Sequence, residues 1–219
     1  METYQMIYQG GSGEIVEKKS RFIAHVFSVT SEEEAQKYID ETKKKYWDAR
    51  HNCYAFIVGT RGEITRCSDD GEPSGTAGRP ILEVLTGSRL RNVLVVVTRY
   101  FGGTLLGTGG LVRAYCQAAQ AGLEGSTVIQ VQEGFRIGIR TDYNGIGKLQ
   151  YIAAQDKIPV LDTLYTDQVE MIMVVPSEDK DGLVKKVTEA TAGQAELDIS
   201  DPLVFYLLEG KPVVVEKEV

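Results

Sequence analysis

The sequence has few cysteines, and no pair of them is spaced to hold a metal ion or a redox centre. Cys53, Cys67 and Cys116 form no C-x-x-C motif, and an odd number in a chain of 219 residues does not indicate a disulfide framework. We therefore expect reduced thiols packed inside the fold. A zinc site that joins His51 to the cysteines is disfavoured because these spacings match no known finger or ribbon.

Long apolar runs are also missing, which excludes a membrane-spanning helix. The longest runs, such as residues 93–97 and 171–175, are far shorter than the roughly 18 residues that such a helix needs. The N-terminus lacks a basic stretch followed by an apolar one, so no secretory signal is evident. These absences predict a cytoplasmic protein with no membrane partner.

The motifs of common hydrolases are absent as well. The chain contains no H-E-x-x-H and no G-x-S-x-G, and no cysteine stands in a recognisable active-site context. We interpret the two histidines, His25 and His51, as structural. The sequence therefore predicts no catalytic residue, no metal and no cofactor, and it favours a protein that is not an enzyme.

The composition that is present is that of a globular protein. Hydrophobic residues make up 42% of the chain and charged residues 25%, which excludes a disordered, collagen-like or coiled-coil chain. At roughly 150 residues per domain, the length allows one domain or two small ones.

Charge is divided unevenly along the chain. Residues 1–125 contain 15 Lys and Arg against 15 Asp and Glu, whereas residues 126–219 contain 9 against 16, so the net charge of −7 lies in the second part. Residues 50–113 hold no lysine but eight of the eleven arginines. Arginine is favoured over lysine where a carboxylate or phosphate must be bound in a fixed plane. We expect no specificity for DNA. The eight are Arg50, Arg61, Arg66, Arg79, Arg89, Arg91, Arg99 and Arg113.

Local patterns predict a helix and a hairpin in the first part. Ser31 and Glu34 form an S-x-x-E capping box, and a helix follows that closes on three consecutive lysines at residues 43–45. Residues 53–58 are apolar, and both they and residues 64–67 are predicted to be extended, on either side of a turn that contains Gly59 and Gly62. These two segments are expected to pair.

Residues 68–80 differ from an ordinary linker. They contain three carboxylates, three glycines and two prolines, so they form neither a helix nor a central strand. They could form a rigid loop whose Asp and Ser side chains cap backbone amides, or they could form the wall of a functional site. The residues of this predicted wall are Asp69, Asp70, Glu72, Ser74, Thr76 and Arg79.

A glycine-rich segment between a strand and a helix is the strongest candidate site. The buried strand 93–98 leads into glycines 102–110, and a helix is predicted over 111–123. In this arrangement, unpaired backbone amides and the positive end of the helix dipole face the loop, where an anion can bind. A close approach between backbone segments would also explain the glycines. Neither a Walker A motif nor G-x-G-x-x-G is present. The predicted anion-binding or nucleic-acid-binding residues are Arg99, Tyr100, Gly102, Gly103, Gly107, Thr108, Gly109, Gly110 and Arg113.

The second part of the chain reads as a further small domain. Extended segments at 135–141, 158–165 and 169–175, helices at 145–154 and from Ser177 onward, and a final strand at 203–208 give the order β-α-β-β-α-β of ferredoxin-like domains. We expect domains over residues 1–132 and 133–219.

Residues 68–82 and 92–115 resemble the two signature blocks of the YigZ/IMPACT family, in the right order and at short spacing. The resemblance implies an α+β fold whose first domain is like the second domain of ribosomal protein S5 and whose second is like elongation-factor domain V. It also implies a link to translation, because eukaryotic relatives inhibit a stress-activated initiation-factor kinase by competing for its activator protein. Bacterial relatives have been suggested to bind nucleic acid or ribosomes. Eukaryotic members carry an additional N-terminal partner-binding domain, for which the chain before Ile15 is too short.

Two functions remain in competition at the glycine loop. The first is a translation-linked binding protein that engages RNA or the ribosome, or a protein partner in translation control, with Tyr100 and Phe101 able to stack on unpaired bases. The acidic pI of about 5.0 argues against a dedicated nucleic-acid binder, although the surplus lies in the second part. The alternative is an enzyme or sensor for a phosphorylated small molecule or nucleotide, in which Asp69, Asp70 or Glu72 holds Mg²⁺ or acts as a base.

Overall fold

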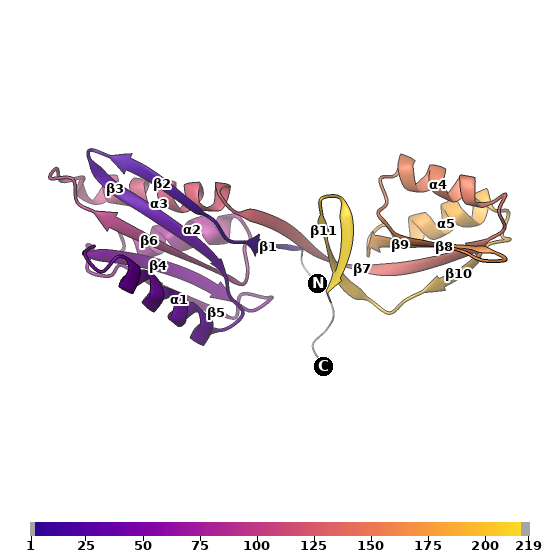
Figure 1. Ribbon diagram of the computed structural model, residues 1–219, viewed down its shortest axis with the longest axis horizontal. Helices are drawn as coiled ribbons and strands as arrows, with labels where there is room; N and C mark the ends of the chain where they lie inside the picture. Colours follow the sequence, from indigo (N-terminus) through magenta and orange to yellow (C-terminus); the bar gives the residue numbers. More distant parts are fainter. Residues whose placement is uncertain (1–2, 216–219) are drawn as a thin grey trace. The chain divides into compact units, whose positions relative to one another are not determined.

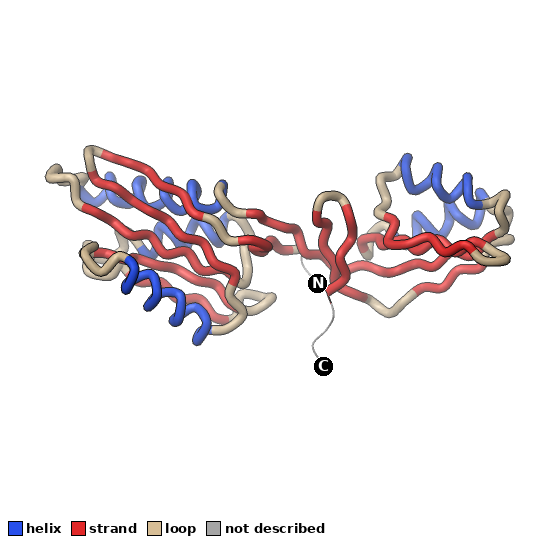
Figure 2. The backbone as a smooth tube through the Cα atoms, in the orientation of Figure 1, coloured by secondary structure: helices blue, strands red, loops and turns tan. Residues whose placement is uncertain are grey.

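The computed structural model describes residues 3–215, which form two compact units of mixed α and β structure (Figure 1). The N-terminal unit is Tyr4–Ile129, and the C-terminal unit contains the other described residues. Strands form the centre of each unit and helices cover them (Figure 2).

The N-terminal unit is built on a five-stranded sheet whose neighbouring strands are all antiparallel. Its order is β2 (Ser12–Glu17), β3 (Ser20–Ser28), β6 (Val93–Tyr100), β4 (His51–Val58) and β5 (Ile64–Ser68). Strand β6 lies in the middle because its run of valines can be buried on both faces. A short strand, β1 (Tyr4–Gln9), bonds through Gln5 to the backbone of Arg89 and Arg91.

Helices cover both faces of this sheet. Alternate residues of β6 point in opposite directions: Val93, Val95 and Val97 pack with α2 (Gly78–Gly87) and α3 (Gly107–Glu124). Leu94 and Val96 pack with α1 (Glu32–Lys45) on the other face. The result is a three-layer unit with two apolar cores.

The predicted local signals of this unit are confirmed. The Ser31 hydroxyl accepts a hydrogen bond from the backbone N–H of Glu34 at 3.1 Å, and Lys43, Lys44 and Lys45 form the last turn of α1. The Glu34 carboxylate accepts a hydrogen bond from the backbone N–H of Thr30 at 2.7 Å. In a standard capping box it would accept from the N–H of the cap residue itself, one position later. Strands β4 and β5 form the expected hairpin.

In the C-terminal unit, a long central strand organises the sheet. Strand β7 (Thr127–Thr141), which begins within the N-terminal unit, pairs on one edge with β9 (Val169–Pro176), and β9 pairs with β8 (Val160–Tyr165). The other edge of β7 carries β10 (Glu196–Ile199) and then β11 (Leu203–Leu208), which continues into β12 (Lys211–Val215). Helices α4 (Ile146–Gln155) and α5 (Lys180–Ala190) contribute to the apolar core of this unit.

Two sequence-based expectations for this unit are wrong. The last helix does not begin after Ser177, because the N–H of Ser177 donates to the carbonyl of Glu133 and Asp179 closes a turn onto Pro176; α5 begins at Lys180 with Asp179 as its cap. The predicted strand at 203–208 is present as β11, but the strand that directly follows α5 is β10, so the place of 203–208 in the predicted element order is wrong. Its four residues contain only two apolar side chains, Leu197 and Ile199, too few to stand out by alternation.

Candidate functional site

A cavity of about 640 Å³ opens at the end of the N-terminal sheet where β6 ends and β4 begins. The two strands are antiparallel neighbours with His51 opposite Arg99, so the segments that precede β4 and follow β6 meet there. The residues that line the cavity are Asp48, Arg50, His51, Arg99, Tyr100, Phe101 and Leu105.

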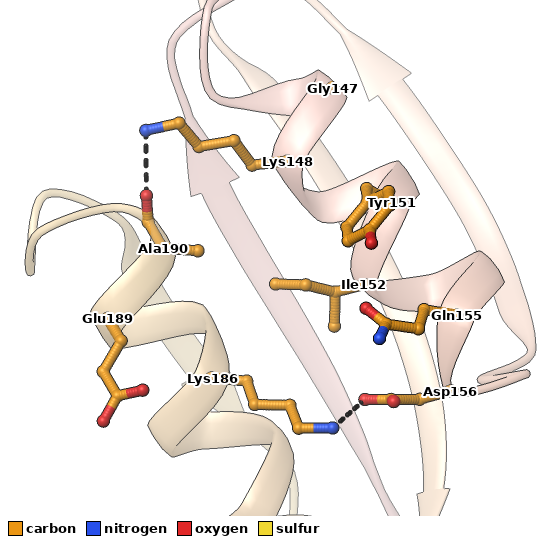
Figure 3. Close-up of a pocket in the computed structure, with 9 residues that line it drawn as sticks. All are labelled: Gly147, Lys148, Tyr151, Ile152, Gln155, Asp156, Lys186, Glu189 and Ala190. Atoms are coloured by element: carbon orange, nitrogen blue, oxygen red, sulfur yellow. Dashed lines mark hydrogen bonds and ion pairs between the residues drawn. The ribbon is translucent and has the colours of Figure 1, made fainter.

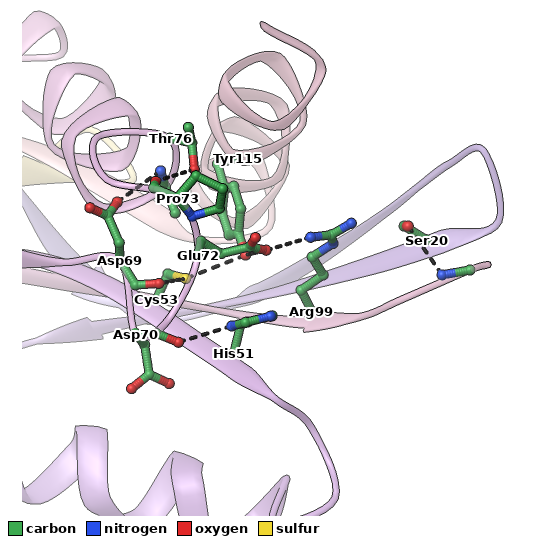
Figure 4. A network of polar contacts seen from close by, with 12 residues as sticks. Ser20, His51, Cys53, Asp69, Asp70, Glu72, Pro73, Thr76, Arg99 and Tyr115 are labelled. Carbon is green, nitrogen blue, oxygen red and sulfur yellow. Dashed lines mark hydrogen bonds and ion pairs between the residues drawn. The ribbon is translucent and has the colours of Figure 1, made fainter. Parts of the chain in front are cut away.

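A buried ion pair behind this cavity joins the two unusual segments of the sequence (Figure 4). The Nη1 of Arg99 lies 2.6 Å from Oε1 of Glu72, and the two side chains are 7% and 3% exposed. The hydroxyl of Tyr115 on α3 donates to the same oxygen at 2.8 Å. Burial raises the pKa of Tyr115, so its hydroxyl stays protonated and can donate. Loop 68–80, strand β6 and helix α3 are therefore held at one point.

The rest of the Arg99 guanidinium faces aromatic rings. Its central carbon lies 5.4 Å from the ring centre of Phe22, the residue opposite Arg99 on β3, and 5.7 Å from that of Phe101. The Nε–H is buried without a hydrogen-bond partner. Within residues 3–215, Glu72 is the one acceptor that the guanidinium reaches.

Asp69 anchors the start of α2. Its carboxylate accepts hydrogen bonds from the backbone N–H groups of Gly75, Ala77 and Gly78 at 2.8, 3.0 and 2.8 Å. Partial burial raises the pKa of this carboxyl, but the three bonds outweigh that effect and hold the pKa below its ordinary value of 3.8. This carboxylate satisfies amides that the first turn of a helix leaves unpaired.

We expect Asp69→Asn to remove a pH-dependent part of the stability. Because the folded pKa is lowered, the carboxylate stabilises the fold above its ordinary value of 3.8 and loses that contribution as pH falls through the lower folded value. At neutral pH the variant should unfold with a free energy about 1–3 kcal/mol below that of the unchanged protein. Urea unfolding at several pH values should show this gap closing as the pH falls below the ordinary value of 3.8. A gap that is constant with pH would contradict the assignment.

Asp70 fixes the orientation of His51. The carboxylate of Asp70 accepts from Nζ of Lys43 and from the N–H of Asn52, both at 2.7 Å. The Nδ1 of His51 lies 2.9 Å from the backbone oxygen of Asp70. A carbonyl can only accept, so Nδ1 carries a proton, and in the neutral ring Nε2 is left as an acceptor.

The thiols differ in environment. Cys53 is buried beside the carbonyl of Asp69 and the hydroxyl of Tyr115, and burial raises its pKa. Cys67 on the edge strand β5 is exposed, so the expectation of packed thiols fails there. Among the described residues, no group of three or more His, Cys, Asp and Glu side chains could hold a metal ion.

The glycines of the predicted anion loop serve different purposes. A Cβ on Gly102 would lie 2.0 Å from the backbone carbon of Lys19, so a close approach requires this glycine. Gly103 and Gly107 have φ of +85° and +70°. Gly109 needs neither explanation, because a Cβ there would meet nothing within 4 Å. Within the described residues, no side chain caps the start of α3, so its first amides lack a side-chain partner.

Two of the predicted anion-binding residues line this cavity, and the others do not. Arg99 and Tyr100 line the cavity, whereas Thr108, Arg113 and the glycines at 102, 103, 107, 109 and 110 are not among its lining residues. Of the predicted wall, Thr76 bonds within the loop to the carbonyl of Pro73, and Ser74 is exposed. Arg79 is exposed and pairs with Glu83. Asp69, Asp70 and Glu72 are occupied by protein donors, as described above.

Sequence reasoning missed Asp48, Arg50 and His51 as cavity residues. No pattern in the sequence separates Arg50 from the other seven arginines of residues 50–113. The sequence gives His51 no role beyond a structural one. The signal that connects them is the pairing of β4 with β6, which brings residue 51 opposite residue 99.

A cavity of about 670 Å³ in the C-terminal unit lies between α4 and α5 (Figure 3). Its two lysines are occupied: Lys148 donates to the carbonyl of Ala190 at 2.8 Å, and Lys186 pairs with Asp156 at 2.6 Å.

Among the described helices, none is both long and apolar enough to cross a membrane.

Two family models match the chain. The Impact N-terminal domain matches residues 18–123, and a domain of unknown function, DUF1949, matches residues 139–194. These matches fall in the N-terminal and C-terminal units respectively.

Curated relatives are similar over most of the chain. IMPACT family member YvyE of Bacillus subtilis (strain 168) is 38% identical over 197 residues, which are 90% of this chain and 91% of that protein. IMPACT family member YigZ of Escherichia coli (strain K12) is 31% identical over 182 residues, 82% of this chain and 89% of that protein. Protein IMPACT homolog of Dictyostelium discoideum is 42% identical over 105 residues, but these are 46% of this chain and 29% of that protein.

A solved structure is also similar to this chain over most of its length. It is described as the crystal structure of a hypothetical protein, and it is 29% identical with a TM-score of 0.57. The similarity covers 90% of this chain and 97% of that one. With relatives this similar along nearly its whole length, the chain belongs to the IMPACT family.

Proposed function

We propose that this protein is a translation-linked binding protein that engages RNA or the ribosome through the start of helix α3. The observation that carries the proposal is the uncapped N-terminus of an 18-residue helix, preceded and opened by exposed glycines. Bare amides and the positive end of the helix dipole attract phosphate oxygens. A glycine at 109, which neither packing nor φ requires, leaves this end open to a ligand.

Arg113 supplies the mobile positive charge in this proposal. It lies in the second turn of α3, it is exposed, and within residues 3–215 its side chain has no ion pair or hydrogen bond. Arg99 has a different role, because its buried pair with Glu72 fixes the end of β6 from which the glycine loop departs. The proposed site thus has a rigid base and an exposed cation.

The finer fold assignments belong to the same proposal. The C-terminal unit has the element order and the strand order β10-β7-β9-β8 of ferredoxin-like domains, which supports a relation to elongation-factor domain V. We propose the N-terminal unit as the domain like ribosomal protein S5, with the boundary after residue 132. A role at the ribosome places the protein in the cytoplasm.

Binding across a salt series tests this function. Purified full-length protein is titrated with ribosomes and with structured RNA, and Arg113→Gln is compared with the unchanged protein. Loss of one phosphate contact should weaken binding to all RNA alike and make the log–log salt slope shallower by about one.

Arg79→Gln is the matched control, because Arg79 is an exposed arginine of the same unit that pairs with Glu83. It should leave both affinity and slope unchanged. Absence of any salt-dependent affinity for ribosomes or RNA, with the protein folded, removes the proposal.

A further inference from the structure

The cavity at the start of β4 and the end of β6 contains a cation that no other group among residues 3–215 pairs with. Arg50 is exposed, and within the described part of the chain its guanidinium has no ion pair and no hydrogen bond. The lysines of the cavity between α4 and α5 are both occupied (Figure 3). A guanidinium held at a cavity rim is suited to bidentate binding of a phosphate group.

The same cavity presents two hydrogen-bond acceptors. The Nδ1–H of His51 is committed to the carbonyl of Asp70, which leaves Nε2 as the acceptor of the neutral ring (Figure 4). Asp48 accepts from the hydroxyl of Tyr100 at 2.7 Å through Oδ1, and its other oxygen has no donor within residues 3–215. These acceptors match sugar hydroxyls and the amino groups of bases.

An aromatic ring completes the cavity. The side chain of Phe101 is 56% exposed, and the guanidinium of Arg99 lies against its ring. Because Arg99 is itself fixed by Glu72, the ring is backed by an immobile group. Exposed aromatic rings beside cationic side chains are the usual platform for an unstacked base.

We propose that this cavity binds one nucleoside monophosphate unit, either free or as an unpaired nucleotide of an RNA chain. Its base stacks on Phe101, its phosphate is bound by Arg50, and Asp48 and His51 accept from its hydroxyl or amino groups. A volume of about 640 Å³ suits a ligand of this size. The RNA-borne form of the ligand rests on the proposed function, whereas the free form does not.

Calorimetric titration of the full chain with AMP, GMP, CMP and UMP tests the free form. Inorganic phosphate and adenosine serve as part-ligands, and at least one nucleotide should bind more tightly than either part. Arg50→Gln and Phe101→Ala should each lower that affinity about fivefold or more, and Phe101→Tyr should restore it. Arg61→Gln, an exposed arginine beyond the other end of β4, is the control and should change nothing.

A single-stranded hexanucleotide and a blunt RNA duplex test the RNA-borne form. Phe101→Ala should weaken binding of the single strand about fivefold or more and leave the duplex unchanged, whereas Arg113→Gln should weaken both. Nucleotide binding that depends on Phe101, without ribosome or RNA binding, supports the cavity and removes the translation proposal. RNA binding that Arg113→Gln weakens and Phe101→Ala does not, with no nucleotide bound, overturns the cavity proposal and retains the other.

Discussion

Arg99→Ala lowers the free energy of unfolding by about 3–5 kcal/mol, the largest stability effect that we expect in this protein. Removal of the guanidinium leaves the Glu72 carboxylate, which is 3% exposed, without a cation. Among the described residues, the hydroxyl of Tyr115 is then the one side-chain donor left to it. A buried carboxylate in that state carries most of its desolvation penalty uncompensated.

Urea unfolding measures this effect. Arg79→Ala is the control, because its pair with Glu83 has side chains that are 76% and 65% exposed, and we expect a change of no more than about 0.5 kcal/mol. The double variant Glu72→Gln/Arg99→Met removes both charges and should recover part of the loss. Arg99→Ala within about 1 kcal/mol of the unchanged protein would show that the pair does not anchor the loop. Binding assays on Arg99 variants are interpretable only after this measurement.

Gly102→Ala should destabilise the protein by about 1–3 kcal/mol through overpacking. The added methyl would lie 2.0 and 2.2 Å from the backbone carbon and oxygen of Lys19, so the turn between β2 and β3 or the loop after β6 must move. Since that loop carries Phe101, the shift should also alter the cavity.

Gly109→Ala is the matched comparison, because it has the same chemistry at a helical position with open space. It should stabilise the protein by up to about 1 kcal/mol, since alanine loses less backbone entropy in a helix. Thermal unfolding of both variants gives the signs. Equal effects at the two positions would contradict the assignment of Gly102 to a close backbone approach.

Sequence patterns located helix α1, the hairpin of β4 and β5, strand β6 and most of helix α3 in the N-terminal unit, because their signals are local. The Ser31 cap needs contacts three residues apart, and the burial of β6 follows from a continuous apolar run. The partners of the Asp70 and Glu72 carboxylates could not be predicted in this way, because they lie at least 18 residues away along the chain. Glu72 meets an arginine 27 residues later, and only the pairing of β4 with β6 and the packing of α3 bring these groups together.

Dependence on contacts between distant residues also explains why one strand of the C-terminal unit could not be predicted. Its helices and the strands β7, β8, β9 and β11 have sequence patterns that predict them, whereas β10 has four residues and is specified by pairing with β7. The acidic residues of loop 68–80 were open to interpretation as metal ligands or as backbone caps. The distances decide for Asp69, whose oxygens accept from three backbone amides.

The contact of Glu72, Arg99 and Tyr115 has a consequence for how such sequences can diverge. Replacing Glu72 or Arg99 alone leaves the other charge in the interior without its partner, and replacing Tyr115 with a residue that lacks a hydroxyl removes a donor from the buried carboxylate. Substitutions at the three positions are therefore expected to be non-additive in their effect on stability, although the residues lie in a loop, a strand and a helix. A change at one of these positions is tolerated best together with a matching change at another.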